Sequence, residues 1–76
     1  MNESEKAVFE FIKAEIKKAE TDEFVYIRSQ KIIEAAEISR NTFHKVVKKL
    51  KLNGTLIVDD YFLSFGYKLP KEKNNE

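Results

Sequence analysis

The sequence predicts a single small α+β domain, in which three helices, a short strand and a closing β-hairpin share one core. Two observations predict this class. Apolar residues recur with the 3.6-residue period of helices up to Gly54 and with the two-residue period of strands after it. A chain of 76 residues can bury one core and no more. The domain is therefore expected over residues 1–69, and residues 70–76, which begin with Pro70, form a polar tail.

The composition is typical of a folded intracellular protein. Hydrophobic residues make up 42% of the chain and include six Phe and three Tyr, which favours a packed core. The absence of cysteine excludes disulfides and thiolate metal sites and is compatible with a reducing cytoplasm. No apolar run approaches the roughly 18–20 residues that span a membrane. We expect a cytoplasmic protein with no membrane segment, metal ion or cofactor.

The first helix is expected to start after Ser4, a good N-cap residue, and to end near Ala19. Its main apolar stripe consists of Val8, Phe9, Ile12, Ile16 and Ala19. A second, narrower stripe of Ala7, Phe11 and Ala14 lies to one side of the first. Two interpretations are open: Phe11 packs at the margin of the core, or the narrow stripe contacts a second subunit.

A short strand and a short helix follow the loop at Thr21–Glu23. The β-branched and aromatic run Phe24–Ile27 is expected to form a brief edge strand. Ser29 can cap a second helix over Gln30–Glu37. The residues of this helix that face inward are Ile32, Ile33 and Ala36. Because only one or two residues separate it from the next helix, the two must cross steeply, as in a helix-turn-helix.

The third helix lies between Ser39, its expected N-cap, and Gly54, just past its end. Its core face follows the helical period and comprises Phe43, Val46, Val47 and Leu50. Its opposite face comprises Asn41, His44, Lys45 and Lys48, with Arg40 and Lys49 at the edges. Residues 39–53 carry five basic and no acidic side chains, while the other nine basic residues stand against all thirteen acidic ones, a net charge of −4. A nearly neutral chain is therefore strongly polarised.

The two-residue period after Gly54 predicts a β-hairpin. Leu56 and Val58 lie on one side of the outgoing strand, and Asp59–Asp60 form the turn. The returning strand alternates through Tyr61, Leu63, Phe65, Tyr67 and Leu69. Asp-Asp is a weaker turn signal than Asn-Gly, so a loop longer than two residues is an open alternative. The aromatic row is expected to pack on the helices, and stacking on nucleic-acid bases is the alternative.

The order of these elements resembles that of the winged helix-turn-helix transcriptional regulators of bacteria, archaea, phages and plasmids. The residues that carry the resemblance are IIEAAEISRNTF from Ile32 and LKLNGTLI from Leu50, and it extends from Ser4 to Leu69. It implies that the third helix is the recognition helix and that the hairpin is the wing. The sequence departs from the family at Glu37, where the turn usually has Gly, and at the wing tip, which is often basic but is acidic here.

Such a cationic helix suits the major groove of double-stranded DNA, which admits an α-helix. Arg40 can donate two hydrogen bonds to guanine and Asn41 can bond adenine in a bidentate way, so both are predicted base readers. The full set of predicted DNA-binding residues is Gln30, Lys31, Ser39, Arg40, Asn41, Thr42, His44, Lys45, Lys48 and Lys49. The wing residues are Asp59, Asp60 and Tyr61, of which the two carboxylates disfavour phosphate contact.

We predict sequence-specific binding of double-stranded DNA by a transcriptional regulator, with no small-molecule ligand. The alternatives are a winged-helix protein-interaction module and an accessory factor of plasmid or phage replication or recombination. Catalysis is not expected, because adjacent aspartates in a turn splay apart and His44 is the only histidine. A homodimer is expected through Ala7, Phe11 and Ala14, since one recognition helix reads only a few base pairs.

Overall fold

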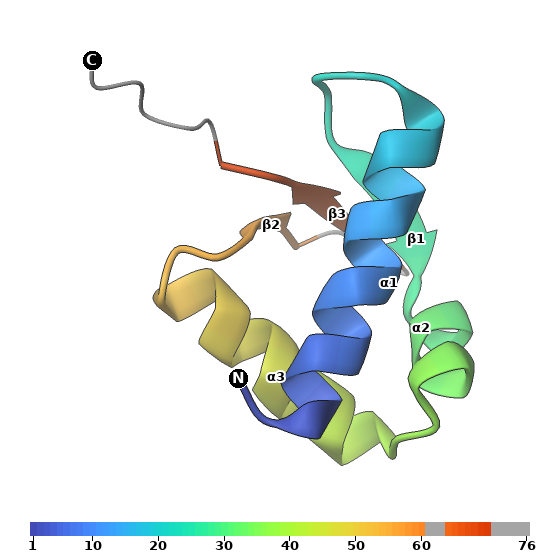
Figure 1. Ribbon diagram of the computed structural model, residues 1–76, viewed down its shortest axis with the longest axis vertical. Helices are drawn as coiled ribbons and strands as arrows, with labels where there is room; N and C mark the ends of the chain where they lie inside the picture. Colours follow the sequence, from blue (N-terminus) through green and yellow to red (C-terminus); the bar gives the residue numbers. More distant parts are fainter. Residues whose placement is uncertain (61–63, 71–76) are drawn as a thin grey trace.

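The computed structural model describes residues 1–60 and 64–70. In this part of the chain three helices and one three-stranded antiparallel sheet follow one another in the order α1, β1, α2, α3, β2, β3 (Figure 1). The helices are α1 (Glu3–Ala19), α2 (Ser29–Ala36) and α3 (Arg40–Leu52), and the strands are β1 (Val25–Arg28), β2 (Ile57–Asp59) and β3 (Ser64–Lys68). The predicted α+β class is therefore confirmed. Tyr61, Leu63 and the tail after Pro70 lie outside the described residues.

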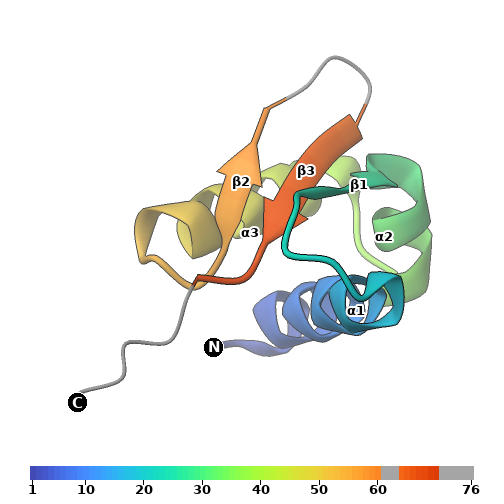
Figure 2. The same ribbon diagram turned by 90° about the horizontal axis from the view of Figure 1, so that it is seen from above.

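The core lies where α1 meets α2, α3 and the inner face of the sheet (Figure 2). Its fully buried side chains are Val8, Ile12, Ile32, Phe43, Leu50, Leu56 and Tyr67. The four apolar positions predicted for α3 are all buried. In α1 the main stripe stops at Ile16, and the expectation that Ala19 belongs to it is wrong. Ala19 is exposed because the helix ends there and Glu20 turns into the left-handed region.

The sheet has the order β1-β3-β2, so β1 is an edge strand, as predicted. Pairing of Ile27 with Phe65, and of Tyr67 with Val25 and Val58, puts these apolar side chains on the inner face. Tyr67 is completely buried, which confirms that this strand packs on the helices. Asp59 pairs with Gly66 inside the ladder, so its assignment to the turn was wrong.

The N-terminus of α1 differs from the prediction that Ser4 is its cap. Asn2 is the N-cap, and its side chain accepts a hydrogen bond of 2.8 Å from the backbone N–H of Glu5. The carboxylate of Glu5 accepts one of 3.2 Å from the backbone N–H of Asn2. This reciprocal capping box satisfies two donors at once, which a cap at Ser4 could not do, because the residue three positions after Ser4 is Ala7. Similarly, Ser29 is the first residue of α2, and Arg28 stands at its N-cap without a side-chain bond.

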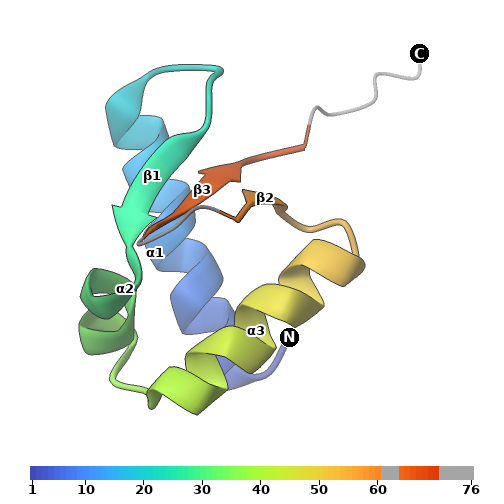
Figure 3. The same ribbon diagram turned by 180° about the vertical axis from the view of Figure 1, so that it is seen from behind.

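The turn between the end of α2 and the start of α3 is short, and the two helices run in different directions on either side of it (Figure 3). The helix α2 ends at Ala36, one residue before the predicted end. Glu37 then adopts a φ of 57°, in the left-handed region that glycine usually occupies. The N–H of Ile38 donates to the carbonyl of Ile33 at 3.2 Å, which closes a Schellman-type end. The turn thus has the backbone shape of a glycine turn without the glycine.

Replacing Glu37 by glycine should raise the free energy of unfolding by roughly 0.5–1 kcal/mol, because glycine adopts this conformation without the Cβ penalty. Urea unfolding at neutral pH measures the change. The matched control is Glu37→Ala, which removes the same charge but keeps the Cβ, and it should not stabilise the protein. A Glu37→Gly variant no more stable than the wild type would contradict this account of the turn.

Candidate functional site

The candidate site is the solvent-facing side of α3 together with the start of α2. Ser39 begins α3 as predicted, because its hydroxyl oxygen accepts a hydrogen bond of 3.1 Å from the N–H of Thr42. Gly54 follows the end of the helix with a φ of 80°. Burial of Phe43 and Leu50 on the inner side fixes the rotation of the helix about its axis. The predicted DNA-binding residues Asn41, His44, Lys45 and Lys48 are consequently all exposed, as are Arg40 and Lys49.

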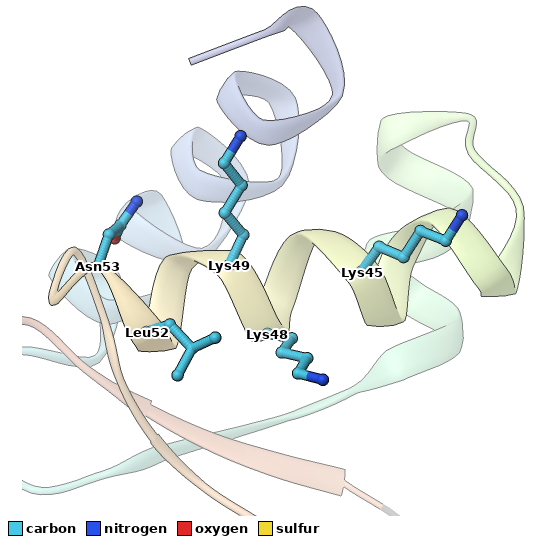
Figure 4. A pocket seen from close by; sticks show the side chains of 5 residues that line it. All are labelled: Lys45, Lys48, Lys49, Leu52 and Asn53. Carbon is cyan, nitrogen blue, oxygen red and sulfur yellow. The ribbon is translucent and has the colours of Figure 1, made fainter.

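Among the described residues, two of the five cations of α3 form ion pairs. The Lys49 Nζ lies 2.9 Å from the Oε2 of Glu5, and the Lys51 Nζ lies 3.7 Å from the Oδ2 of Asp60. Figure 4 shows Lys49 extending toward the start of α1, whereas Lys48 leaves the other side of α3. Lys45 and Lys48 have no ion pair within residues 1–60 and 64–70. These two lysines are therefore the cations of α3 most available to an outside anion.

The start of α2 lies against the start of α3. The Nη2 of Arg40 donates to the Oε1 of Gln30 at 2.7 Å, and the Nε2 of Gln30 donates to the Oε2 of Glu34 at 3.1 Å. Two residues predicted for the site are thus brought together across the turn, and Lys31 lies exposed beside them. The sequence reasoning did not include Glu34. The signal was its position four residues after Gln30, on the same face of a helix.

Three further side chains of α3 were predicted to contact DNA. The hydroxyl of Ser39 donates a hydrogen bond of 3.0 Å to that of Thr42, so these two side chains stabilise the N-terminus of α3. The His44 ring packs edge-on against Phe43 and Phe65, with centroid distances of 5.3 and 6.2 Å. His44 therefore faces the hairpin, where it lines a pocket of about 270 Å³ together with Lys48.

Leu52 is a residue that the sequence reasoning missed. Its side chain is 74% exposed, and it lines a shallow pocket of about 380 Å³ with Lys45, Lys48, Lys49 and Asn53 (Figure 4). The signal was its helical phase, since at 100° per residue Leu52 falls on the same side as Asn41 and Lys48. The cationic face of α3 therefore ends in an exposed apolar side chain.

The predicted wing residues are only partly described. The carboxylate of Asp59 accepts a hydrogen bond of 2.5 Å from the hydroxyl of Tyr26, on the outer face of the sheet. Asp60 pairs with Lys51 of α3, which reduces the negative charge that the hairpin presents toward that helix. Tyr61 lies outside the described residues. The narrow stripe of α1 is divided: Ala7 and Ala14 are exposed, whereas Phe11 is half-buried and packs against the core.

Buried Tyr67 and nearly buried Glu5 show opposite shifts of pKa. Burial, with a smaller contribution from the charge of Asp60, raises the pKa of the Tyr67 phenol, whose hydroxyl has no hydrogen-bond partner among the described residues. The hydrogen bond from Lys49 is the main cause that lowers the pKa of the Glu5 carboxyl, against an opposing effect of burial. Glu5 therefore holds Lys49 as a charged partner at neutral pH.

The remaining observations define no other site. In the part of the chain that the structure describes, no group of three or more His, Cys, Asp or Glu side chains is placed to hold a metal ion. No helix of residues 1–60 and 64–70 combines the length and the apolar character needed to cross a membrane. The chain matches no protein-family model, no curated protein and no solved structure.

The Glu5–Lys49 pair makes the free energy of unfolding depend on pH in the acidic range. Because the folded pKa of Glu5 lies below its usual value, the stabilisation is fully present above about pH 5 and is lost as the pH falls through the lowered pKa. We expect Glu5→Gln to lower the urea midpoint at pH 7 and to differ less from the wild type at pH 3. Glu10→Gln, at an exposed position of the same helix, is the control and should leave the midpoint at pH 7 unchanged. Equal effects of Glu5→Gln at both pH values would refute the role of the ion pair.

Proposed function

We propose that the chain is a winged helix-turn-helix protein that binds double-stranded DNA sequence-specifically and regulates transcription. The observation that carries the proposal is the acid-free, solvent-facing side of α3, which is held outward by a buried opposite side. The element order and the hairpin β2–β3 beside α3 support the family assignment. An α-helix of this kind fits the major groove, where its first residues meet base edges.

The dimensions of α3 suit this use. With its side chains an α-helix is about 10–12 Å across, which matches the groove width of about 12 Å, and the 13 residues of α3 make it roughly 20 Å long. Arg40 and Asn41 at its first turn have the donors and acceptors that distinguish guanine and adenine. Lys45 and Lys48 follow one and two turns later, where the helix would meet the phosphate backbone. Lys31, which follows Gln30 at the start of α2, adds an exposed cation near the start of α3.

The ion pairs change the roles that the sequence suggested. Lys49 contributes less to phosphate binding than Lys48 in this proposal, because Glu5 already neutralises it at 2.9 Å. Ser39 and Thr42 support DNA binding in this proposal by stabilising the N-terminus of α3, since their hydroxyls are hydrogen-bonded to each other. We also propose a homodimer through α1, which would double the number of base pairs read. Of the narrow stripe, Ala7 and Ala14 are exposed for such a contact, whereas Phe11 is half-buried.

One observation favours a second function, that of a protein-interaction module. Leu52 is 74% exposed among three lysines, which suits a partner surface that combines an apolar side chain with carboxylates. The two functions differ in their response to salt. DNA binding weakens steeply with salt through counterion release, and a protein-only module would show no retention on DNA.

Variants of α3 test the proposed function. At a site selected from a random duplex pool, Arg40→Ala and Asn41→Ala should each cost roughly 1–3 kcal/mol and relax the base preference at one position. Lys48→Ala should weaken binding to all sequences alike and reduce the salt slope by about one. Fluorescence anisotropy over a series of salt concentrations measures both effects.

The control for Lys48→Ala is Lys17→Ala, which removes an exposed lysine from α1 without touching α3. It should leave the salt slope unchanged. The proposal fails if the wild type does not bind duplex DNA at low salt, or if Lys17→Ala and Lys48→Ala change the slope equally.

A further inference from the structure

The start of α2 and the start of α3 are joined by a chain of three polar side chains. Glu34 accepts a hydrogen bond of 3.1 Å from the amide nitrogen of Gln30, and the amide oxygen of Gln30 accepts one of 2.7 Å from Arg40. All three side chains are exposed. Forming these two hydrogen bonds therefore costs little desolvation, and the three side chains lie on the surface that carries the candidate base readers.

The chemistry of the three groups allows only one orientation of the Gln30 amide. A carboxylate only accepts hydrogen bonds and a guanidinium only donates them. If the amide were turned over, its oxygen would face the carboxylate of Glu34 and its NH₂ group would face the guanidinium of Arg40. Both contacts would be repulsive. Glu34 thus reinforces the orientation, favoured also by Arg40 itself, in which Gln30 presents an acceptor to Arg40.

This contact limits the directions that the Arg40 side chain can take without using up its donors. A guanidinium has five N–H groups, and the bond to Gln30 uses one hydrogen of Nη2. The second hydrogen of Nη2 and those of its neighbours remain, so a bidentate edge is still available. An arginine that is already held in one geometry loses less freedom when it binds.

We propose that Glu34 is a positioning residue for base recognition, which acts through Gln30 to hold Arg40 toward a guanine in the major groove. The inference rests on the proposed function, since it names guanine as a base that the proposed DNA-binding surface recognises. Guanine is the base whose major-groove edge offers two acceptors, O6 and N7, to one guanidinium edge. Glu34 itself does not touch DNA in this arrangement.

Two substitutions of Glu34 separate positioning from charge. Glu34→Gln and Glu34→Ala both remove one negative charge, so both should raise the affinity for all duplexes by the same factor. Only Glu34→Gln keeps an oxygen that can accept from Gln30. Binding motifs selected from a random duplex pool should show a guanine preference in the wild type and in Glu34→Gln. In Glu34→Ala this preference should fall on the order of tenfold, at one position only.

The position is identified with Arg40→Ala, which should lose the preference for the same guanine. The double variant Arg40→Ala/Glu34→Ala should lose no more than Arg40→Ala alone, because the two residues act as a unit. Gln30→Ala provides a second test, and it should weaken the same position. Thermal unfolding of each variant checks that the fold is kept, and a purely structural role of Glu34 would change the melting temperature without changing the motif.

The outcomes distinguish this inference from the proposed function. If no variant and no wild type binds duplex DNA, the proposed function and the inference both fall. If the protein binds DNA but Glu34→Ala and Glu34→Gln select the same motif, only the positioning role is overturned. A Glu34→Ala protein that prefers the guanine more strongly than the wild type would also overturn the positioning role, because the hydrogen bonds from Glu34 through Gln30 would then hold Arg40 away from DNA.

Discussion

Burial of one side of α3 is the constraint on which the candidate site depends. Phe43 is completely buried and its ring stacks on Phe65 at a centroid distance of 6.1 Å, while Leu50 is fully buried two turns later. A rotation of the helix by one residue, or 100°, would expose these side chains and turn lysines toward the core, at a cost of several kcal/mol. The cationic side of α3 is thus fixed in space by the packing of the other side.

Electrostatic pairing then divides the cations of α3 into two groups. Lys49 and Lys51 pair with Glu5 near the start of α1 and with Asp60, the residue that follows β2. Lys45 and Lys48 form no ion pair within residues 1–60 and 64–70. The acidic residues of the chain are therefore used at the edges of the basic surface and leave its centre positive. A nearly neutral protein can in this way present a field that attracts an anionic partner.

The features that could be predicted from the sequence are those that depend on local spacing. The phase of α3, its cap at Ser39 and its end before Gly54 are set within a few residues. The site depends in addition on contacts between segments, and those were not predicted. Asp59 was assigned to a turn from its residue type alone, whereas it pairs with Gly66 in the sheet and accepts a hydrogen bond from Tyr26, 33 residues away. The bond between Gln30 and Arg40 exists because α2 and α3 meet at the turn, which helical periodicity alone does not describe.

The central claim is that the outer side of α3 is the surface that meets DNA. Titration of the isotopically labelled protein with a short duplex at low salt, followed by NMR of the backbone amides, tests it most directly. The account predicts that amide signals change along α3 from Arg40 to Lys48 and at Lys31, while those of Gly66 and Lys68 on the sheet stay in place. Unchanged signals along α3, with changes centred on the outer face of the sheet, would contradict it.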